Sequence, residues 1–305
     1  MSECRITHVR YVGLGVRSFD RQVGFYQDLW GLVAEQSESG VSYLAAAGST
    51  DPYSLRLRKA GEDRVDVVSF AVPTAADVDW YAERLIARRV RMISGPASLD
   101  TAGGGYGMRF HDPDGRTVEI AAGLTPRMAR EVAEREHVPT GLSHVVLNSP
   151  DLPATTRWYV EVLGFAITDY LEDVMVFLKS ATDFHHCLAL AQGPHVSLNH
   201  VAYETRGLDE YLRATGSMMR AGGDLVWGPG RHGPGDNTFA YFCDESGFVA
   251  EYTTALERIA DFEAWAPRVW KRVPQESDQW GTACVRRPEP FVGRPDPGLW
   301  TPPPF

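Results

Sequence analysis

The sequence predicts an α+β fold in which one unit occurs twice, and each occurrence forms paired βαβββ modules that share a curled mixed sheet. Two pairs of matching passages lead to this prediction. ITHVRYVGLGVRSFDRQVGFYQDLWGL, from Ile6, matches LSHVVLNSPDLPATTRWYVEVLGF, from Leu142, and each contains a strand, a polar turn and an amphipathic helix with an aromatic pair. DPDGRTVEI, from Asp112, matches DESGFVAEY, from Asp244, and each is a turn that opens a strand.

The two matches have nearly the same offset, which favours duplication over chance. His8 aligns with His144 (144 − 8 = 136), and Glu119 aligns with Glu251 (251 − 119 = 132). The predicted organisation is an N-terminal domain, a linker that begins as a charged helix, a C-terminal domain and a tail rich in proline and tryptophan, with boundaries at 1–124, 125–139, 140–258 and 259–305.

The elements of the second occurrence follow from alternation, apolar periodicity and capping signals. Strands are predicted around residues 144–147, 174–178, 187–191, 200–204, 239–243 and 248–253. Helices are predicted around 152–163 and 208–221. Pro153 near the start of the first helix and Gly164 just past its end fit the usual preference for proline and glycine at these two positions.

The tail is predicted to pack on the rest of the chain, because it holds four tryptophans that would be a large apolar surface in water. In FEAWAPRVWKRV, Phe262, Trp265 and Val269 fall at i, i+3 and i+7, which predicts the beginning of a helix with one docked face. We expect the tail to lie across the open side of the C-terminal domain or on a neighbouring subunit.

Composition indicates a soluble, cytoplasmic protein that acts on small molecules. The net charge of -10 comes without long runs of one sign, so a nucleic-acid partner is not expected. No run of about 18 apolar residues is present, and a membrane partner is not expected either. The four cysteines are scattered without the CxxC spacing of a metal or redox site, at Cys4, Cys187, Cys243 and Cys284.

Three potential metal ligands each lie in an apolar strand of the second occurrence. They are His144 in LSHVV, His200 in LNHVAYE and Glu251 in FVAEYT. Strands of one curled sheet can converge on a point, and two imidazoles with one carboxylate are the facial triad of non-haem Fe(II) oxygenases. Burial of Glu251 is costly unless a cation balances its charge. The sequence therefore predicts a divalent metal site.

Taken singly, each of these residues also has a purely structural interpretation. A strand histidine is often a hydrogen-bonded core residue, and a glutamate near a strand end is usually solvated. The first occurrence serves as an internal control, because aligning VVSFAVP with SLNHVAY places Phe70 where His200 stands. This occurrence keeps His8 and Glu119 but lacks the middle ligand, and it is predicted to bind no metal.

The duplicated modules and the His, His, Glu set resemble the vicinal oxygen chelate superfamily, whose fold is glyoxalase-like. Within it they resemble the type I extradiol ring-cleaving dioxygenases, which are catechol 2,3-dioxygenases and 2,3-dihydroxybiphenyl 1,2-dioxygenases. The resemblance covers roughly residues 5–260. It implies an enzyme of aromatic catabolism that opens a catechol-type diol with O2 at Fe(II), or Mn(II), held by the three ligands.

The resemblance also implies three further catalytic residues. His186 in DFHHCLAL precedes His200 by 14 positions (200 − 186 = 14), as does the family's acid or base that is not a ligand. His232 in GRHGPGDN matches the histidine of a glycine-rich loop that contacts or ionises a substrate hydroxyl. Tyr241 in FAYF matches the tyrosine that hydrogen-bonds a substrate oxygen.

Two departures from the family pattern bear on the substrate subgroup. Ala240 stands where a bulky aliphatic residue is usual, and Glu245 stands where a proline is usual, although the first occurrence has Pro113 there. Neither departure involves a proposed ligand. His185 and His195 are expected to be surface or turn residues without a role.

Three alternative functions are open at this level. A 2-oxo acid dioxygenase of the hydroxyphenylpyruvate type also uses two histidines and a glutamate in one half. A lyase or isomerase of the glyoxalase type takes its ligands from both halves, which Phe70 disfavours. A sequestering protein of the antibiotic-resistance kind keeps the paired modules without metal. Exposed sheet edges and the aromatic tail predict a homo-oligomer.

Overall fold

The computed structural model describes residues 3–38 and 40–300 of the 305-residue chain. The N-terminal unit comprises the elements up to Ala122. They are β1 (His8–Val16), α1 (Phe19–Gly24), η1 (Phe25–Leu29), β2 (Val33–Glu38), β3 (Val41–Ala45), β4 (Leu55–Lys59), β5 (Arg64–Ala71), α2 (Ala75–Ala87), β6 (Met92–Ser98), β7 (Tyr106–His111) and β8 (Thr117–Ala122).

The C-terminal unit repeats this succession and adds one short 3₁₀ turn. Its elements are β9 (Gly141–Ser149), α3 (Leu152–Trp158), η2 (Tyr159–Leu163), β10 (Ala166–Leu171), β11 (Met175–Lys179), β12 (Leu188–Gln192), β13 (Ser197–Glu204), α4 (Leu208–Arg220), β14 (Asp224–Arg231), η3 (Pro234–Asp236), β15 (Thr238–Cys243) and β16 (Val249–Thr253). The tail contains β17 (Arg268–Trp270), α5 (Pro274–Ser277), β18 (Val285–Arg286) and α6 (Glu289–Val292).

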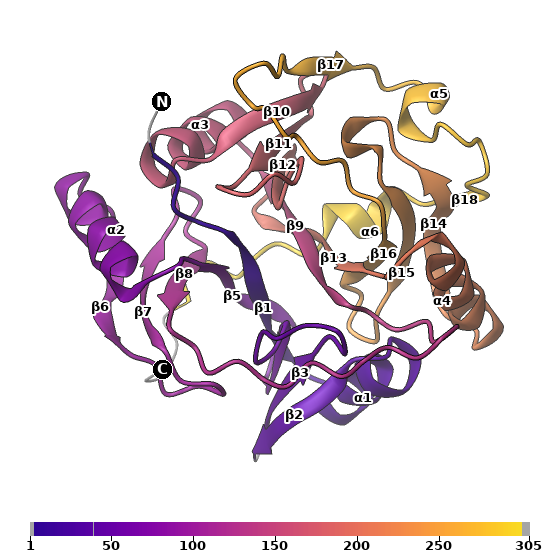
Figure 1. Ribbon diagram of the computed structural model, residues 1–305, viewed down its shortest axis with the longest axis horizontal. Helices are drawn as coiled ribbons and strands as arrows, with labels where there is room; N and C mark the ends of the chain where they lie inside the picture. The colour runs from indigo at the N-terminus through magenta and orange to yellow at the C-terminus, as the bar shows by residue number, and fades with distance from the viewer. Residues whose placement is uncertain (1–2, 39, 301–305) are drawn as a thin grey trace.

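The strands of the described residues form two mixed sheets (Figure 1). The N-terminal sheet has the order β2-β3-β4-β1-β5-β8-β7-β6. The C-terminal sheet has the same order in β10-β11-β12-β9-β13-β16-β15-β14, with β17 and β18 of the tail paired onto its two edges. The predicted duplication and α+β fold are confirmed. The tail also covers both edges that would otherwise expose unpaired backbone groups.

Buried residues of both units form one hydrophobic cluster. The first helical segment of each unit, α1–η1 or α3–η2, packs against the other unit. Trp30 follows η1 and stacks on Tyr252 of β16, with ring centroids 3.7 Å apart and planes at 8°. The Tyr26 hydroxyl donates to Asp244 Oδ2 at 2.9 Å. In the reciprocal contact, the Tyr159 hydroxyl donates to the carboxylate of Asp112 at 3.0 Å.

Two β-bulges in the centre of the C-terminal sheet place neighbouring side chains on the same face. In β13 the pairing with β9 passes from Leu198 to His200, which leaves Asn199 as the extra residue. In β9 the pairing passes from His144 to Leu142, which leaves Ser143 as the extra residue. Bulges of this kind re-aim side chains and are common beside active sites.

Two predictions of local structure are wrong. Residues 123–140 contain no regular helix. The backbone amide of Arg127 donates to Thr50 O, and its guanidinium donates to the carbonyls of Ala46, Ala47 and Ser49, so these donors are used on the N-terminal unit instead of within a helix.

The predicted helix in the first part of the tail is replaced by strand β17. Pro267 biases the residue before it away from helical geometry, and Arg268–Trp270 pairs in parallel with β10. Val269, expected on a docked face, has 66% of its surface exposed. No helix among the described residues combines the length and the apolar character needed to cross a membrane.

Candidate metal centre

Three neighbouring strands bring the predicted ligands together in the C-terminal unit. His144 lies on β9, His200 on β13 and Glu251 on β16, and their ligand atoms all lie within 4.8 Å of one another. Ala202 of β13 pairs with both His144 and Glu251, so β13 sets the spacing. The Nε2 atoms of His144 and His200 lie 3.2 and 3.1 Å from Glu251 Oε2.

The bulge residues determine how the two imidazoles face the site. His200 Nδ1 lies 2.8 Å from the amide oxygen of Asn199, and His144 Nδ1 lies 3.0 Å from the hydroxyl of Ser143. An amide oxygen only accepts, so His200 carries its proton on Nδ1 and directs the Nε2 lone pair at Glu251. A partner on the outer nitrogen is how proteins orient histidine ligands.

The charges in this cluster fit a divalent cation. Burial lowers the pKa of His144 to about 3, and it also lowers the pKa of His200, so both imidazoles are neutral. Burial raises the pKa of Glu251, although the neighbouring His200 acts in the opposite direction. Among the described residues, His200 Nε2 and Glu251 Oε2 have no hydrogen-bond partner of proper geometry. Acceptor atoms that face one another need a cation between them.

His186 lies beside the cluster and outside the ligand set. Its ring centroid is 4.5 Å from that of His144, and the residue is buried. Burial lowers its pKa well below the ordinary value, and the charges of neighbouring histidines act in the same direction. The ring is therefore neutral in the cavity, and a neutral imidazole has one nitrogen that acts as an acceptor.

The expectation that His185 lies at the surface is wrong. Its ring is fully buried, with Nδ1 2.9 Å from His186 Nδ1 and Nε2 3.2 Å from Asp169 Oδ2. Trp265 and Trp270 of the tail cover this region, and Trp270 Nε1 donates to Asp169 Oδ2 at 2.6 Å. His185 is thus a buried support for His186, because the tail closes over it.

His232 and Tyr241 form a hydrogen-bonded pair at the cavity wall. The Tyr241 hydroxyl lies 2.7 Å from His232 Nε2, and His232 Nδ1 donates to the carbonyl of Ser277 at 3.1 Å. The tail carbonyl fixes the imidazole tautomer, so Nε2 accepts a hydrogen bond from the tyrosine hydroxyl. Burial raises the pKa of Tyr241 well above its usual value and lowers that of His232 to about 4.

Five of the six predicted site residues line one cavity of about 230 Å³, and the sixth, Glu251, contacts two of them, His144 and His200. Most of the remaining wall is apolar, and the tail supplies four of its residues. The other lining residues are Val146, Leu171, Met175, Phe177, Ala191, Asn199, Trp227, Pro234, Asn237, Ser277, Arg286, Pro288 and Phe291. The tail therefore lies over the C-terminal unit as expected, by means of α5, β18 and α6.

Strand pairing shows which residues of the N-terminal unit occupy the positions of His144 and His200, and they differ from those that the sequence alignment predicted. Ser69 pairs with both Tyr11 and Glu119, as Ala202 pairs with His144 and Glu251. Tyr11 therefore takes the place of His144, and Val67, two residues before Ser69, takes the place of His200. The alignments of His8 and Phe70 with the ligands are wrong, because strand pairing matches the two units at one offset (144 − 11 = 133 and 200 − 67 = 133), whereas the local sequence likeness placed His8 and Phe70 at offsets of 136 and 130.

Glu119 is held by arginines at the position that Glu251 occupies in the other unit. Arg10 Nη2 lies 2.6 Å and Arg109 Nε 2.8 Å from its carboxylate, and the Ser69 hydroxyl donates at 2.8 Å. Burial would raise its pKa, but the two guanidinium charges lower it to about 2. Glu119 thus belongs to an ion-pair network in place of a metal site.

Sequence reasoning missed the residues that support the site. Asn199, Ser143 and Asp169 contact His200, His144 and His185. A signal existed for two of them, since a polar residue precedes each ligand histidine in LSHVV and LNHVAYE. The contacts of the tail had no sequence signal, because they join segments far apart in the chain.

The sequence of this chain is similar to a family model and to several curated proteins. Residues 5–120 and 141–252 match the family model described as the Glyoxalase/Bleomycin resistance protein/Dioxygenase superfamily. Metapyrocatechase 2 from Cupriavidus necator is 29% identical over 236 residues, which is 71% of each chain. The manganese-dependent 2,3-dihydroxybiphenyl 1,2-dioxygenase from Geobacillus genomosp. 3 is 24% identical over 281 residues, covering 86% of this chain and 89% of the relative.

A solved structure is similar over almost the whole chain. It is described as the Mn(II)-bound glyoxalase from Novosphingobium aromaticivorans, with a TM-score of 0.92 and 38% sequence identity. The match covers 97% of this chain and 98% of that chain. The likeness therefore extends beyond the two units into the tail.

Proposed function

We propose a function on the premise that this chain belongs to the Glyoxalase/Bleomycin resistance protein/Dioxygenase superfamily. The protein is an extradiol dioxygenase that opens the ring of a catechol-type diol with O2. The observation that carries this proposal is the convergence of His144, His200 and Glu251 beside a largely apolar cavity. Relatives named metapyrocatechase and 2,3-dihydroxybiphenyl 1,2-dioxygenase support it.

The three ligands would hold Fe(II), or Mn(II), through two imidazole nitrogens and a carboxylate oxygen. A bound metal of this kind supplies open coordination positions at which a diol and O2 meet. The protein contributes orientation and exclusion of water, since the ligands are buried and the cavity wall is mainly aliphatic and aromatic.

His186 would act as the acid or base, because it is neutral, buried and close to His144 without a ligand's place in the cluster. Its Nδ1 faces His185, so Nε2 is the nitrogen left to accept a proton from the substrate and return it. His185 holds the ring from behind and does not touch the cavity.

Tyr241 and His232 would orient the diol. Because Ser277 fixes the tautomer of His232, the Tyr241 hydroxyl donates to His232 Nε2 and keeps its own lone pairs for the cavity. The tyrosine oxygen can then accept a hydrogen bond from a substrate hydroxyl. This pair would align the two adjacent oxygens of a catechol with the ligand cluster.

The alternatives fit the geometry less well. A glyoxalase-type lyase or isomerase would draw ligands from both units, but Tyr11 and Val67 stand at the matching histidine positions and arginines hold Glu119. A metal-free sequestering protein would have no need of three convergent acceptors. A 2-oxo acid dioxygenase would have no need of the His232–Tyr241 pair beside a catechol-sized site.

The proposal is tested by reconstitution without oxygen. The purified protein is loaded with Fe(II) or Mn(II), mixed with a panel of catechols and exposed to air while visible absorbance is followed. We expect a yellow ring-opened product from at least one diol, and none from the His200→Ala variant. A metal-loaded protein that consumes no O2 with any diol would overturn the proposal.

We also propose a cytoplasmic location and assembly into a homo-oligomer. Support for assembly comes from exposed apolar side chains on α4, where Leu208, Leu212 and Met219 each have nearly half of their surface exposed. Light scattering on the metal-loaded protein measures the assembly state directly, and a monomer at micromolar concentration would contradict it.

A further inference from the structure

A chain of hydrogen bonds joins the ligand His200 to helix α6 of the tail. His200 Nδ1 donates to Asn199 Oδ1 at 2.8 Å, and Asn199 Nδ2 donates to Asn148 Oδ1 at 2.9 Å. Asn148 Nδ2 in turn donates to the Phe291 carbonyl at 2.7 Å and to Ser197 Oγ at 2.8 Å. The orientation of the ligand imidazole thus depends on two amides, and the second amide is held by the tail.

Helix α6 fits closely against the C-terminal sheet at this point. The Ser197 hydroxyl donates to the Val292 carbonyl at 2.6 Å. Gly293 follows with φ of 66°, and a side chain there would meet the Leu198 carbonyl at 2.6 Å. The Phe291 ring reaches the cavity, where it packs edge-on against Tyr241 with centroids 4.9 Å apart.

Beyond α6 the tail crosses back to the N-terminal unit, where Figure 1 shows the yellow chain passing from α6 towards β5 and β8. Arg294 pairs with Asp63 at 2.6 Å. The Asp296 amide donates to the Val196 carbonyl at 2.7 Å, so this residue still contacts the C-terminal unit. The tail therefore spans the junction between the units.

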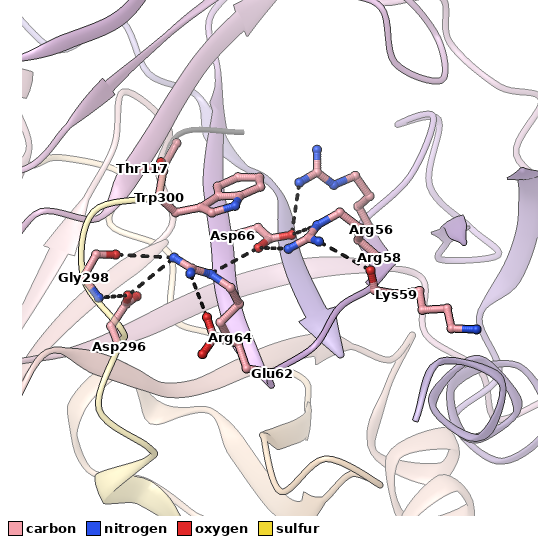
Figure 2. A network of polar contacts seen from close by, with 10 residues as sticks. All are labelled: Arg56, Arg58, Lys59, Glu62, Arg64, Asp66, Thr117, Asp296, Gly298 and Trp300. Carbon is pink, nitrogen blue, oxygen red and sulfur yellow. Dashed lines mark hydrogen bonds and ion pairs between the residues drawn. The ribbon is translucent and has the colours of Figure 1, made fainter. Parts of the chain in front are cut away.

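The tail ends its described course on a cluster of arginines, which Figure 2 shows around Asp66 and Trp300. The Trp300 ring centroid lies 5.5 to 5.8 Å from the guanidinium carbons of Arg56, Arg58 and Arg64. The Trp300 carbonyl accepts from the Thr117 hydroxyl at 2.6 Å. Cation–π contacts and this hydrogen bond hold Trp300 on the N-terminal unit.

Asp66, which holds the arginines under Trp300, occupies the position in the N-terminal unit that matches Asn199 in the C-terminal unit. In β5 the pairing with β1 passes from Val67 to Val65, which leaves Asp66 as the extra residue of a bulge, as Asn199 is in β13. The Asp66 carboxylate accepts two hydrogen bonds of 2.8 and 2.9 Å from Arg58 and so fixes one of the guanidinium groups that contact the Trp300 ring. The tail thus contacts arginines that bind the bulge residue Asp66 in one unit, and Asn148, which binds the bulge residue Asn199, in the other.

We propose that Asn199 and Asn148 are positioning residues for the ligand His200, and that the N-terminal unit supports them by anchoring the tail at Trp300. The inference rests on the metal site of the proposed function. If α6 moved away, the buried Asn148 would lose its carbonyl partner, and its amide could turn away from Asn199. The His200 ring would then lose its fixed direction.

The test is a double-mutant cycle on Mn(II) affinity, measured without substrate on the full chain. Asn148→Ala weakens Mn(II) binding roughly 10-fold, the lower end of the effect of residues that orient metal ligands. Trp300→Ala weakens it in the same direction by about 3-fold, because a distant anchor acts only through that amide. In the double variant the loss stays close to that of Asn148→Ala alone, since both changes act on one contact.

Trp80→Ala is the matched control. Trp80 also lies in the N-terminal unit between two arginines, with the guanidiniums of Arg5 and Arg84 4.3 and 5.2 Å from its ring centroid. It does not touch the tail in any described contact, so its removal lowers thermal stability without changing Mn(II) affinity. Trp300→Phe keeps a ring over the arginines and restores most of the affinity.

Thr117→Val is a second variant for the Mn(II) affinity measurement in case Trp300→Ala lowers solubility. It removes only the hydrogen bond to the Trp300 carbonyl. Wild-type Mn(II) affinity in Trp300→Ala and Thr117→Val would overturn the proposal, and so would losses that simply multiply in the double variant. A protein that binds Mn(II) yet cleaves no diol overturns the proposed function alone, because the cycle is measured without turnover.

Discussion

Two buried glutamates at matching positions have opposite electrostatic surroundings. Burial raises the pKa of Glu251, whereas Arg10 and Arg109 outweigh burial and lower the pKa of Glu119 to about 2. One carboxylate is thus neutralised within the protein, and the other faces two neutral imidazoles. This contrast explains why duplication of the fold does not imply two metal sites.

Glu119→Gln should lower the free energy of unfolding at pH 7 by about 3–5 kcal/mol, because it leaves buried arginine charge without its carboxylate. Because the folded pKa is lowered, the stabilisation by Glu119 is full above its ordinary pKa of 4.5 and is lost as pH falls towards 2. Urea unfolding of both proteins between pH 7 and pH 3 checks this, and we expect the difference to shrink with acid. A constant difference over that range would refute the ion-pair account.

His186→Asn should keep metal and substrate affinity and lower turnover by roughly 10²–10⁴-fold, the usual loss for an acid or base. His8→Asn is the control, since His8 begins β1 of the N-terminal unit and does not line the cavity. Steady-state kinetics with metal content measured in parallel separates the two roles. Normal turnover in His186→Asn would leave the residue a structural part of the cavity wall.

At this scale the sequence predicted which residues meet in the cluster but not how they are held. Spacing and residue type indicated His144, His200 and Glu251, whose roles as ligands stay a prediction. The burial of His185 and the partners of Asn199 depend on the tail and on bulges. Neither leaves a periodic signal, because a bulge changes register by one residue without changing composition.

The hairpin turn between the last two strands of each unit contains a buried aspartate, and the two aspartates have different partners. Asp112 is paired with Arg116 at 2.9 Å and accepts from Tyr159. Asp244 accepts from Tyr26 and Gln22 but has Phe248 where Arg116 stands. Burial without a cation raises the pKa of Asp244 to about 6, despite the hydrogen bonds it accepts.

Asp244 should therefore make the wild-type protein less stable as pH rises. Its folded pKa is raised, so its contribution is present below the ordinary value of 3.8 and is lost as pH passes about 6. The loss is at most roughly 3 kcal/mol. Asp244→Asn should lack this dependence, which unfolding free energies at pH 4, 5, 6 and 7 measure. Parallel pH profiles of the two proteins would contradict the assignment.

Secondary structure was predictable where the apolar pattern was strong, as for β13, β15 and β16. Strands β10 and β14 were missed, since ITDYL mixes polar and apolar residues and WGPG breaks the alternation. The tail was predicted as a helix from three apolar residues, but Pro267 and the free edge of β10 favour a strand. Pairing with strands elsewhere in the chain determines the structure of these three segments, and their local sequence carries no signal for that pairing.

At the scale of the whole molecule, the two units divide the work. The C-terminal unit gathers the three predicted ligands and the cavity, whereas the N-terminal unit fills its matching positions with tyrosine, valine and an ion-pair network. The tail connects them, closing both edges of one sheet and resting on the arginines of the other unit. The domain boundaries predicted from sequence stay a prediction that limited proteolysis can test.

The most direct test of the central claim is the metal content of the folded protein after loading with Fe(II) or Mn(II) and removal of excess metal. The matched pair is His144→Ala and His8→Ala, two histidines that the sequence aligns but the structure places at different positions. We predict one metal ion per chain in the wild type and in His8→Ala, and none in His144→Ala. Full metal content in folded His144→Ala, or its loss in His8→Ala, would contradict a single site in the C-terminal unit.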